Sequence, residues 1–274
     1  MIDTDKPYIF FEGKYSKRSI TVFKKENPVD SVVDIYKLQC REFFEISHPN
    51  LLFKTDLFQK KSHSYVERHK NGGNWIYFPW NRTLIHSVNQ KQYSQLLTNR
   101  NRNLITDNEQ NLLKNFPISI IGLSVGSGIA TTLAYSGISN HFTLAEFDTL
   151  ETTNLNRIRS NLMHIGQSKI DIVAQQIYEV NPYVTLTLIK SGITKKTLIH
   201  IFEEKPKIKL IFEIIDSFEM KIHLRSLARK YRIPLIMVTN IGDRIILDVE
   251  RYDLKKIEFF NGRAGLIPDA ILKN

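Results

Sequence analysis

The sequence contains a single cysteine, Cys40, among its 274 residues. A disulfide within the chain needs two cysteines and a cysteine-based zinc cluster needs several, so both are excluded. Val33, Tyr36 and Phe44 flank Cys40 at helical spacing. We therefore expect a helix in which Cys40 is a buried structural thiol rather than a reactive one.

Long hydrophobic runs are also missing. No uninterrupted apolar stretch reaches the roughly 20 residues that a membrane-spanning helix requires. The first residues, from Met1 to Lys6, are not a basic segment followed by a hydrophobic one, as a secretory signal peptide would be. With 42% hydrophobic residues, the composition is that of a globular chain, and we expect a cytoplasmic protein without membrane association.

Acidic residues are fewer than basic ones. The 28 Asp and Glu residues face 38 Lys and Arg residues, which leaves a formal net charge of +10. This charge favours anionic partners such as ATP, acidic peptides or RNA. Because the basic residues are scattered rather than clustered, the sequence does not favour a nucleic-acid-binding surface.

The sequence does contain an apolar segment, Ile118 to Ile121, followed by a turn of small residues. The turn is Gly122-Leu123-Ser124-Val125-Gly126-Ser127-Gly128, and a helical pattern of apolar residues comes next. Small residues let the backbone approach a phosphate, and the free N–H groups at a helix start attract negative charge. The pattern predicts a nucleotide-binding turn, although glycine between a strand and a helix is also an ordinary packing device.

A second strand is expected from Phe142 to Phe147 and carries Glu146 near its end. Dinucleotide-binding folds place an acidic residue at about this distance, where it holds the ribose hydroxyls. Further polar motifs follow along the chain: Asp148, Asn154-Leu155-Asn156-Arg157 and Gly166-Gln167-Ser168-Lys169.

Together these motifs resemble the ThiF/MoeB group of adenylyltransferases, which are relatives of the ubiquitin-activating enzymes. The resemblance extends from about Arg100 to about Asp253, and its motifs are GLSVGS, EFDTLETTNLNRI, GQSK and VNP. The chain departs from the family pattern in a shorter glycine turn, in Ser124 near a usual glycine, and in Glu146 where aspartate is common.

The resemblance implies ATP and Mg²⁺ as cofactors. It also implies a carboxylate-bearing protein or peptide as the substrate, activated as an acyl-adenylate with release of pyrophosphate. The catalytic residues would be Arg102, Arg157 and Lys169 on the phosphates and Asp216 on the metal. Glu146 would hold the ribose, and the other nucleotide-binding residues would be Gly122, Ser124, Gly126, Ser127, Asp148 and Asn154. Taken singly, Arg157 and Lys169 are equally well explained as surface charges, and Asp216 as a helix cap.

Two further expectations follow from the resemblance. The protein would be a homodimer in which Arg102 reaches the active site of the neighbouring subunit. Because no cysteine follows Cys40, we expect no thioester: the acyl-adenylate would be released or passed to an external nucleophile.

Three other functions would account for parts of the pattern. Gly122-Leu123-Ser124-Val125-Gly126 matches the G-x-S-x-G turn of serine hydrolases, which would need Asp148 and then His164 or His200. A serine hydrolase would have no use for the later motifs, and neither would a dinucleotide-dependent oxidoreductase. A nucleotide-binding protein that organises a partner without catalysis is the remaining alternative.

The predicted fold class is α/β, a Rossmann-like and mostly parallel sheet with helices on both faces. Residues 98–274 would form the ATP-binding domain, and residues 1–97 a smaller α+β region without an assigned role. We expect helices at 167–180, 195–204 and 218–231 and strands at 184–190, 208–215, 233–239 and 244–249, the last a candidate for antiparallel pairing. In the N-terminal region, Asn27-Pro28 predicts the start of a helix that buries Val32, Val33, Tyr36, Cys40, Phe43 and Phe44.

Overall fold

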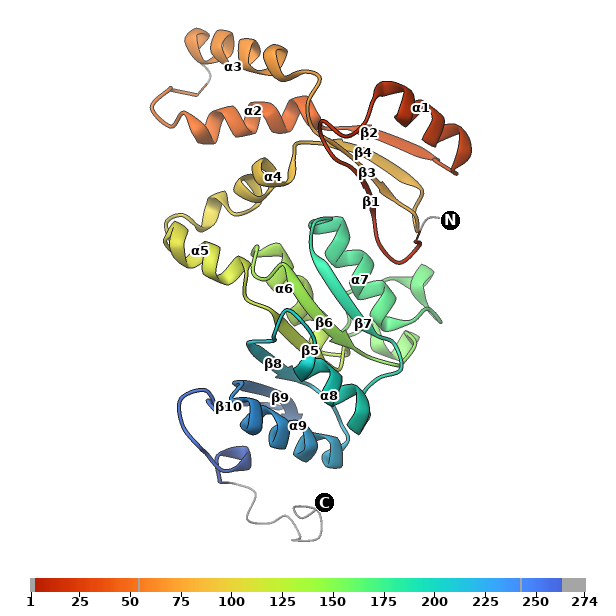
Figure 1. Ribbon diagram of the computed structural model, residues 1–274, viewed down its shortest axis with the longest axis vertical. Helices are drawn as coiled ribbons and strands as arrows, with labels where there is room; N and C mark the ends of the chain where they lie inside the picture. The colour runs from red at the N-terminus through yellow and green to blue at the C-terminus, as the bar shows by residue number, and fades with distance from the viewer. Residues whose placement is uncertain (1–2, 54, 242, 263–274) are drawn as a thin grey trace. The chain divides into compact units, whose positions relative to one another are not determined.

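The computed structural model describes residues 3–53, 55–241 and 243–262. It divides into two compact units (Figure 1). The first unit comprises residues 1–110 together with 178–183, and the second comprises residues 111–177 and 184–274. Within the described residues, no helix has both the length and the apolar character needed to cross a membrane.

The first unit contains a four-stranded sheet in the order β1-β3-β4-β2. The strands are β1 Tyr8–Phe10, β2 Ser31–Asp34, β3 Asn74–Phe78 and β4 Thr83–Ser87, and only β2 pairs in parallel, with β4. Its helices are α1 Lys17–Glu26, α2 Tyr36–Ser47, α3 Asp56–His69 and α4 Gln90–Leu97, followed by the 3₁₀ helix η1 Asn99–Asn101.

The helix expected from Asn27-Pro28 is wrong in its first half. Asn27 ends α1, and the next residues form strand β2, where Val32 and Val33 are exposed. Their β-branched side chains suit an edge strand beside β4, and this pairing overrides the local helix-start signal. The helix begins only at Tyr36, and from there the prediction holds, because Cys40 is fully buried. Burial also raises the pKa of the Cys40 thiol.

The second unit contains a six-stranded sheet in the order β10-β9-β8-β5-β6-β7. The strands are β5 Ile118–Ile121, β6 His141–Ala145, β7 Thr185–Ile189, β8 Leu210–Glu213, β9 Leu235–Ile241 and β10 Arg244–Glu250. All neighbours pair in parallel except β10, which is antiparallel to β9. This is the predicted Rossmann-like sheet, including its antiparallel last strand.

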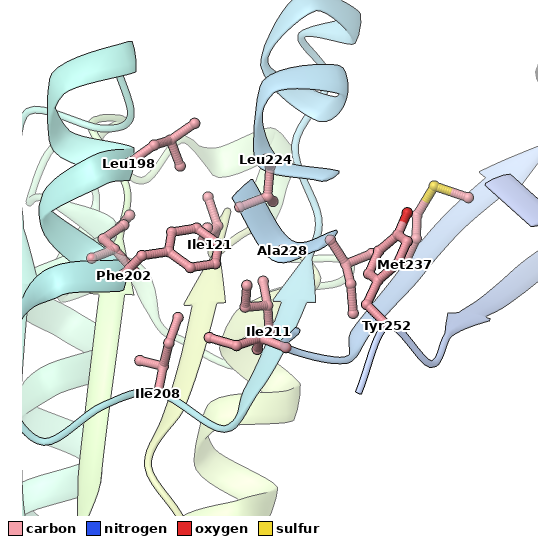
Figure 2. Close-up of a cluster of buried hydrophobic side chains, with 13 residues drawn as sticks. Ile121, Leu198, Phe202, Ile208, Ile211, Leu224, Ala228, Met237 and Tyr252 are labelled. Carbon is pink, nitrogen blue, oxygen red and sulfur yellow. The ribbon is translucent and has the colours of Figure 1, made fainter. Parts of the chain in front are cut away.

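Helices connect these strands in the expected alternation. They are α6 Gly126–Tyr135, α7 Lys169–Val180, α8 Lys195–Glu203 and α9 Phe218–Tyr231, and a further helix, α5 Asp107–Lys114, precedes β5. Figure 2 shows how α8 and α9 cover one face of the sheet: Leu198 and Phe202 on α8, and Leu224 and Ala228 on α9, pack around Ile121 and Ile211. Strand β5 is buried along its whole length, which explains why three of its four residues are isoleucine.

The opposite face of the sheet is open at β10. Ile245, Leu247 and Val249 are 72%, 63% and 43% exposed, and they alternate with residues that face α8 and α9 or are buried. Val238 and Ile236 on β9 lie directly opposite Leu247 and Val249, and therefore point to the same side. We call these five residues the exposed apolar face.

Candidate functional site

The glycine turn lies where strands β5 and β8 run side by side. Gly122 has a φ of +90°, and a Cβ atom placed on it would lie 2.0 Å from the carbonyl oxygen of Ile214, just beyond β8. Only glycine permits this close approach. Connections leave β5 and β8 towards opposite edges of the sheet, and ligands of open α/β sheets bind at such a switch point.

Glu146 fastens this turn to the end of β6. The carboxylate is buried and accepts a hydrogen bond from Leu123 N at 2.8 Å, and from Phe147 N and Asp148 N at 2.8 and 3.1 Å. Three of about four acceptor positions are thus used by the protein itself. The expected contact with a ribose stays a prediction, and the structure adds a role that the sequence did not suggest.

Lys169 and Asp148 form an ion pair close to the same turn. The Lys169 Nζ lies 2.9 Å from Asp148 Oδ2, and the backbone N–H of Lys169 donates to Asp148 O at 2.9 Å. Lys169 is buried whereas Asp148 is half exposed, so the alternative of Lys169 as a surface charge is wrong. A buried ammonium paired with an accessible carboxylate gives the site one cation held at a defined place.

Arg157 approaches the glycine turn from the loop after β6. Its Nε lies 3.4 Å from Ser124 Oγ, and its Nη1 donates to Thr153 O and Asn156 Oδ1 at 3.1 and 3.0 Å. Ser127 Oγ donates to Ser124 O at 2.9 Å. These contacts bring Arg157, Ser124 and Ser127 together, and Arg157 itself remains exposed.

Asn154 shapes the loop that carries Arg157. It is buried, and its Oδ1 accepts from Glu151 N at 3.1 Å. This hydrogen bond closes the short 3₁₀ helix Thr152–Asn154. Asn154 therefore has a structural contact of its own, and its expected bond to phosphate stays a prediction.

Asp216 lies three residues beyond the end of β8. It is exposed and has no hydrogen-bond or ion-pair partner among the described residues. The N-cap of α9 is Ser217, whose side chain accepts from Met220 N, so the alternative of Asp216 as a helix cap is wrong. Arg102 belongs to the first unit and is exposed directly after η1.

Comparison with known proteins identifies the family. The ThiF family model matches residues 98–242, somewhat more than half of the chain. The chain belongs to the ThiF family. It is 35% identical over 181 residues to an uncharacterized protein of Mycobacterium tuberculosis, covering 66% of this chain and 25% of that protein. It is 30% identical over 147 residues to tRNA threonylcarbamoyladenosine dehydratase of Bacillus subtilis, covering 53% of this chain and 56% of that protein. The chain thus spans about half or less of these relatives.

Solved structures agree with this assignment. The Escherichia coli tRNA N6-threonylcarbamoyladenosine dehydratase TcdA in complex with ATP superimposes with a TM-score of 0.51 and 25% sequence identity. The match covers 56% of this chain and 62% of that chain. This ThiF-family chain is therefore similar in fold to a protein whose solved structure contains ATP.

The serine-hydrolase arrangement is not formed in this ThiF-family chain. Ser124 Oγ contacts the guanidinium of Arg157, and no histidine among the described residues hydrogen-bonds to it. His164 instead pairs through Nδ1 with Ser160 Oγ at 2.9 Å, and His200 lies against Glu204. The G-x-S-x-G match is thus explained by the backbone of the turn rather than by a nucleophile.

No preformed metal centre is present in the described part of the chain, where no group of three His, Cys, Asp or Glu residues could hold an ion. Magnesium at a nucleotide site usually takes one or two carboxylates together with phosphate oxygens and water. The single exposed carboxylate of Asp216 fits such a site, because the nucleotide would complete the coordination.

A set of buried charges behind Asp216 was not predicted from the sequence. Glu213, Arg225 and Glu250 are each 0% exposed, and Arg225 lies between the two carboxylates. The signal was present: Glu213 interrupts the apolar run from Leu210 to Ile215, and a charged residue inside such a strand is buried only when it is paired.

Proposed function

We propose that this chain is an ATP-dependent adenylyltransferase that activates a carboxylate as an acyl-adenylate and releases pyrophosphate. The observation that carries the proposal is the set of direct contacts around the glycine turn. Glu146 binds the turn, Asp148 pairs with Lys169, and Arg157 lies on Ser124. Family membership and similarity to an ATP-bound chain support the same reading.

The nucleotide would occupy the switch point between β5 and β8. Helix α6 starts at Gly126 without a side-chain cap, and although Gly128 N donates to Val125 O at 3.1 Å, the N–H groups of Gly126 and Ser127 are available to phosphate oxygens. Lys169 and Arg157 would supply positive charge to the phosphates, and Asp216 would hold Mg²⁺, which neutralises phosphate charge when bound. Glu146 would accept a ribose hydroxyl at its remaining acceptor position.

The chemistry follows from these charges. An oxygen of the substrate carboxylate attacks the α-phosphorus of ATP, the bond from that phosphorus to the bridging oxygen breaks, and pyrophosphate leaves. The substrate carboxylate is already ionised at neutral pH, so no general base is required. What the protein supplies is orientation and neutralisation of two reactants that are both negatively charged.

Replacement of Lys169 tests this assignment. We expect Lys169→Met to slow ATP–pyrophosphate exchange about 100-fold or more, as is typical when one strong electrostatic stabiliser is lost. The matched control is Lys195→Met, because Lys195 is 60% exposed and its ammonium lies 3.5 Å from Glu219 on the protein surface. Equal exchange by both variants would refute the assignment.

The proposed function also predicts the nucleotide preference of the wild-type protein. Calorimetry should show binding of ATP in preference to NAD.

The substrate is proposed to be the carboxylate of a protein or peptide. The chain is 25% identical over 159 residues to ubiquitin-like modifier-activating enzyme 5 of Arabidopsis thaliana, covering 53% of this chain and 36% of that enzyme. Another similar family member carries the name of a tRNA dehydratase. A panel for exchange therefore contains the C terminus of a ubiquitin-like protein, a short peptide and a modified tRNA with a carboxylate.

A homodimer is proposed from the exposed apolar face. Its five residues carry no charge, and an uncharged apolar surface is complementary to a second copy of itself, as a twofold interface requires. We expect Leu247→Glu to convert a dimer into monomers in analytical ultracentrifugation. Ile199→Glu is the control, because Ile199 is partly exposed on α8, which covers the opposite face of the sheet. A wild-type chain that sediments as a monomer at micromolar concentration would refute the dimer.

In such a dimer, Arg102 would complete the site of the partner subunit. Arg102→Ala and Asp216→Ala chains should each be inactive, and mixing them should restore part of the exchange activity, because some mixed dimers hold one intact site. Absence of any recovery on mixing, with dimers present, would exclude the contribution in trans.

A further inference from the structure

A network of buried charges lies behind the turn that carries Asp216. It consists of Glu213 at the end of β8, Lys221 and Arg225 on α9, and Glu250 at the end of β10; we call it the Glu213 network. Lys221 Nζ lies 2.7 Å from Glu213 Oε1, and Arg225 Nη1 lies 2.9 Å from Glu213 Oε2. Arg225 Nε lies 2.8 Å from Glu250 Oε2, although outside hydrogen-bond geometry.

The surroundings of the network are apolar. The guanidinium of Arg225 lies 3.8 Å from the ring centre of Phe260, and its Nη2 is 3.5 Å from Met237 Sδ. Removing charges from water costs several kcal/mol per ion, and well-packed apolar residues often give equal or higher stability at such places. A gain in folding stability therefore does not explain why these charged residues are buried here.

The placement of Glu213 suggests what the network does. Its Oε1 accepts from Ile215 N at 3.1 Å, on the chain just before Asp216, and from Lys221 Nζ on α9, just after it. Glu213 thus contacts the backbone of the turn just before Asp216 and the helix that follows it. Ile214 lies between Glu213 and Ile215 in the chain. Its N–H donates to Ile121 O at 2.8 Å, and its carbonyl group packs against Gly122. The turn is therefore held to β5 and to α9 at once.

We propose that Glu213 is a positioning residue, which fixes the turn so that Asp216 presents its carboxylate to the magnesium–nucleotide complex. This inference rests on the proposed function. Arg225 donates to the second oxygen of Glu213 and forms an ion pair with Glu250. These two residues therefore fix the orientation of the Glu213 carboxylate. The residue acts through Asp216 and touches neither metal nor nucleotide.

Both oxygens of Glu213 are needed for this arrangement. Oε1 accepts from Ile215 N and Lys221, and Oε2 accepts from Arg225. A glutamine has the same size but only one acceptor oxygen, and its NH₂ group would face either a guanidinium or an ammonium. Glu213→Gln therefore loosens one side of the turn while it leaves the Asp216 carboxylate in place.

The test is the magnesium requirement for ATP binding, measured by calorimetry at fixed ATP for the full chain. Asp216→Asn should raise the Mg²⁺ concentration for half-maximal binding about 10-fold or more, which equals the loss of one interaction with a charged group. Glu213→Gln should raise it by a similar factor. The double variant should need no more Mg²⁺ than Asp216→Asn alone, because both changes remove the same contact. The control Glu219→Gln, an exposed residue on the first turn of α9, should match wild type.

The outcomes separate this inference from the proposed function. If Asp216→Asn has the wild-type Mg²⁺ requirement, the metal assignment of the proposed function fails. If Asp216→Asn is impaired but folded Glu213→Gln is not, the positioning role is overturned and Glu213 is structural. Should Glu213→Gln not fold, Lys221→Met serves instead, because Lys221 lies at the edge of the network with a side chain 14% exposed. Folded Lys221→Met with the wild-type Mg²⁺ requirement would overturn the role equally.

Discussion

Replacing Gly122 with alanine perturbs the contact on which the site depends. A Cβ atom at this position would lie 2.0 Å from Ile214 O and 2.7 Å from Ile214 C, where real Cβ atoms keep at least 3.0 Å. The obstacle is backbone, so it cannot swing aside as a flexible side chain would. The substitution must therefore push β5 and the end of β8 apart, or change the φ of +90° at residue 122.

The magnitude follows from two costs. A non-glycine residue in an unfavourable backbone region costs about 1–3 kcal/mol, and an overpacked contact in a buried region costs a similar amount. Together they give a loss of about 2–6 kcal/mol of unfolding free energy, a large part of the roughly 5–15 kcal/mol that stabilises a typical domain. The displaced Ile214 would also move the turn that carries Asp216.

The assay is urea unfolding of Gly122→Ala beside Gly128→Ala. A Cβ on Gly128 meets nothing within 4 Å, and the residue lies in α6, where alanine is up to about 1 kcal/mol more favourable than glycine. Gly128→Ala should therefore be neutral or slightly more stable. If Gly122→Ala unfolds at the wild-type urea concentration, the close approach of β5 and β8 is not what requires glycine, and the reasoning is refuted.

Three further predictions concern single side chains. Glu146→Gln should lower the unfolding free energy by about 1.5–3 kcal/mol without nucleotide, because at least one of three backbone donors loses its acceptor oxygen and the others face a neutral one; unchanged urea unfolding would contradict this. Burial raises the pKa of Glu250, so ionising this carboxyl costs more in the folded chain than in the unfolded one. Wild type should therefore lose stability relative to Glu250→Gln as the pH rises from about 4, in unfolding curves collected up to about pH 7; a constant difference would oppose the prediction. Intact-mass spectrometry after incubation with ATP and substrate should show no covalent adduct, since Cys40 is buried and its raised pKa disfavours the thiolate; an adduct abolished by Cys40→Ser would establish a thioester.

Much of the second unit was predictable, because its strands and helices follow hydrophobic periodicity. Helix Phe218–Tyr231 has the expected bounds, and the strands differ from expectation by at most two residues at either end. The error at Asn27-Pro28 has a physical cause. A capping signal is local, whereas the pairing of Ser31–Asp34 with Thr83–Ser87 joins residues about fifty positions apart, which no local pattern reveals.

In the candidate site, too, local motifs were predictable from the sequence, whereas contacts between distant residues were not. Motif order located Gly122, Lys169 and Arg157, but their contacts depend on the fold. The pairing of Lys169 with Asp148 needs two loops to meet across a gap of 21 residues. The three donors of Glu146 come from two different turns. Arg225 could not be assigned, because its carboxylate partners lie on β8 and β10 and nothing in α9 alone indicates them.

The most direct test of adenylation is exchange of labelled pyrophosphate into ATP in the presence of the acceptor panel. We predict exchange that requires one class of carboxylate acceptor and Mg²⁺, and that falls about 100-fold or more in Asp216→Asn with the fold intact. Cleavage of ATP to ADP and phosphate without pyrophosphate exchange, or full exchange by Asp216→Asn, would contradict the account.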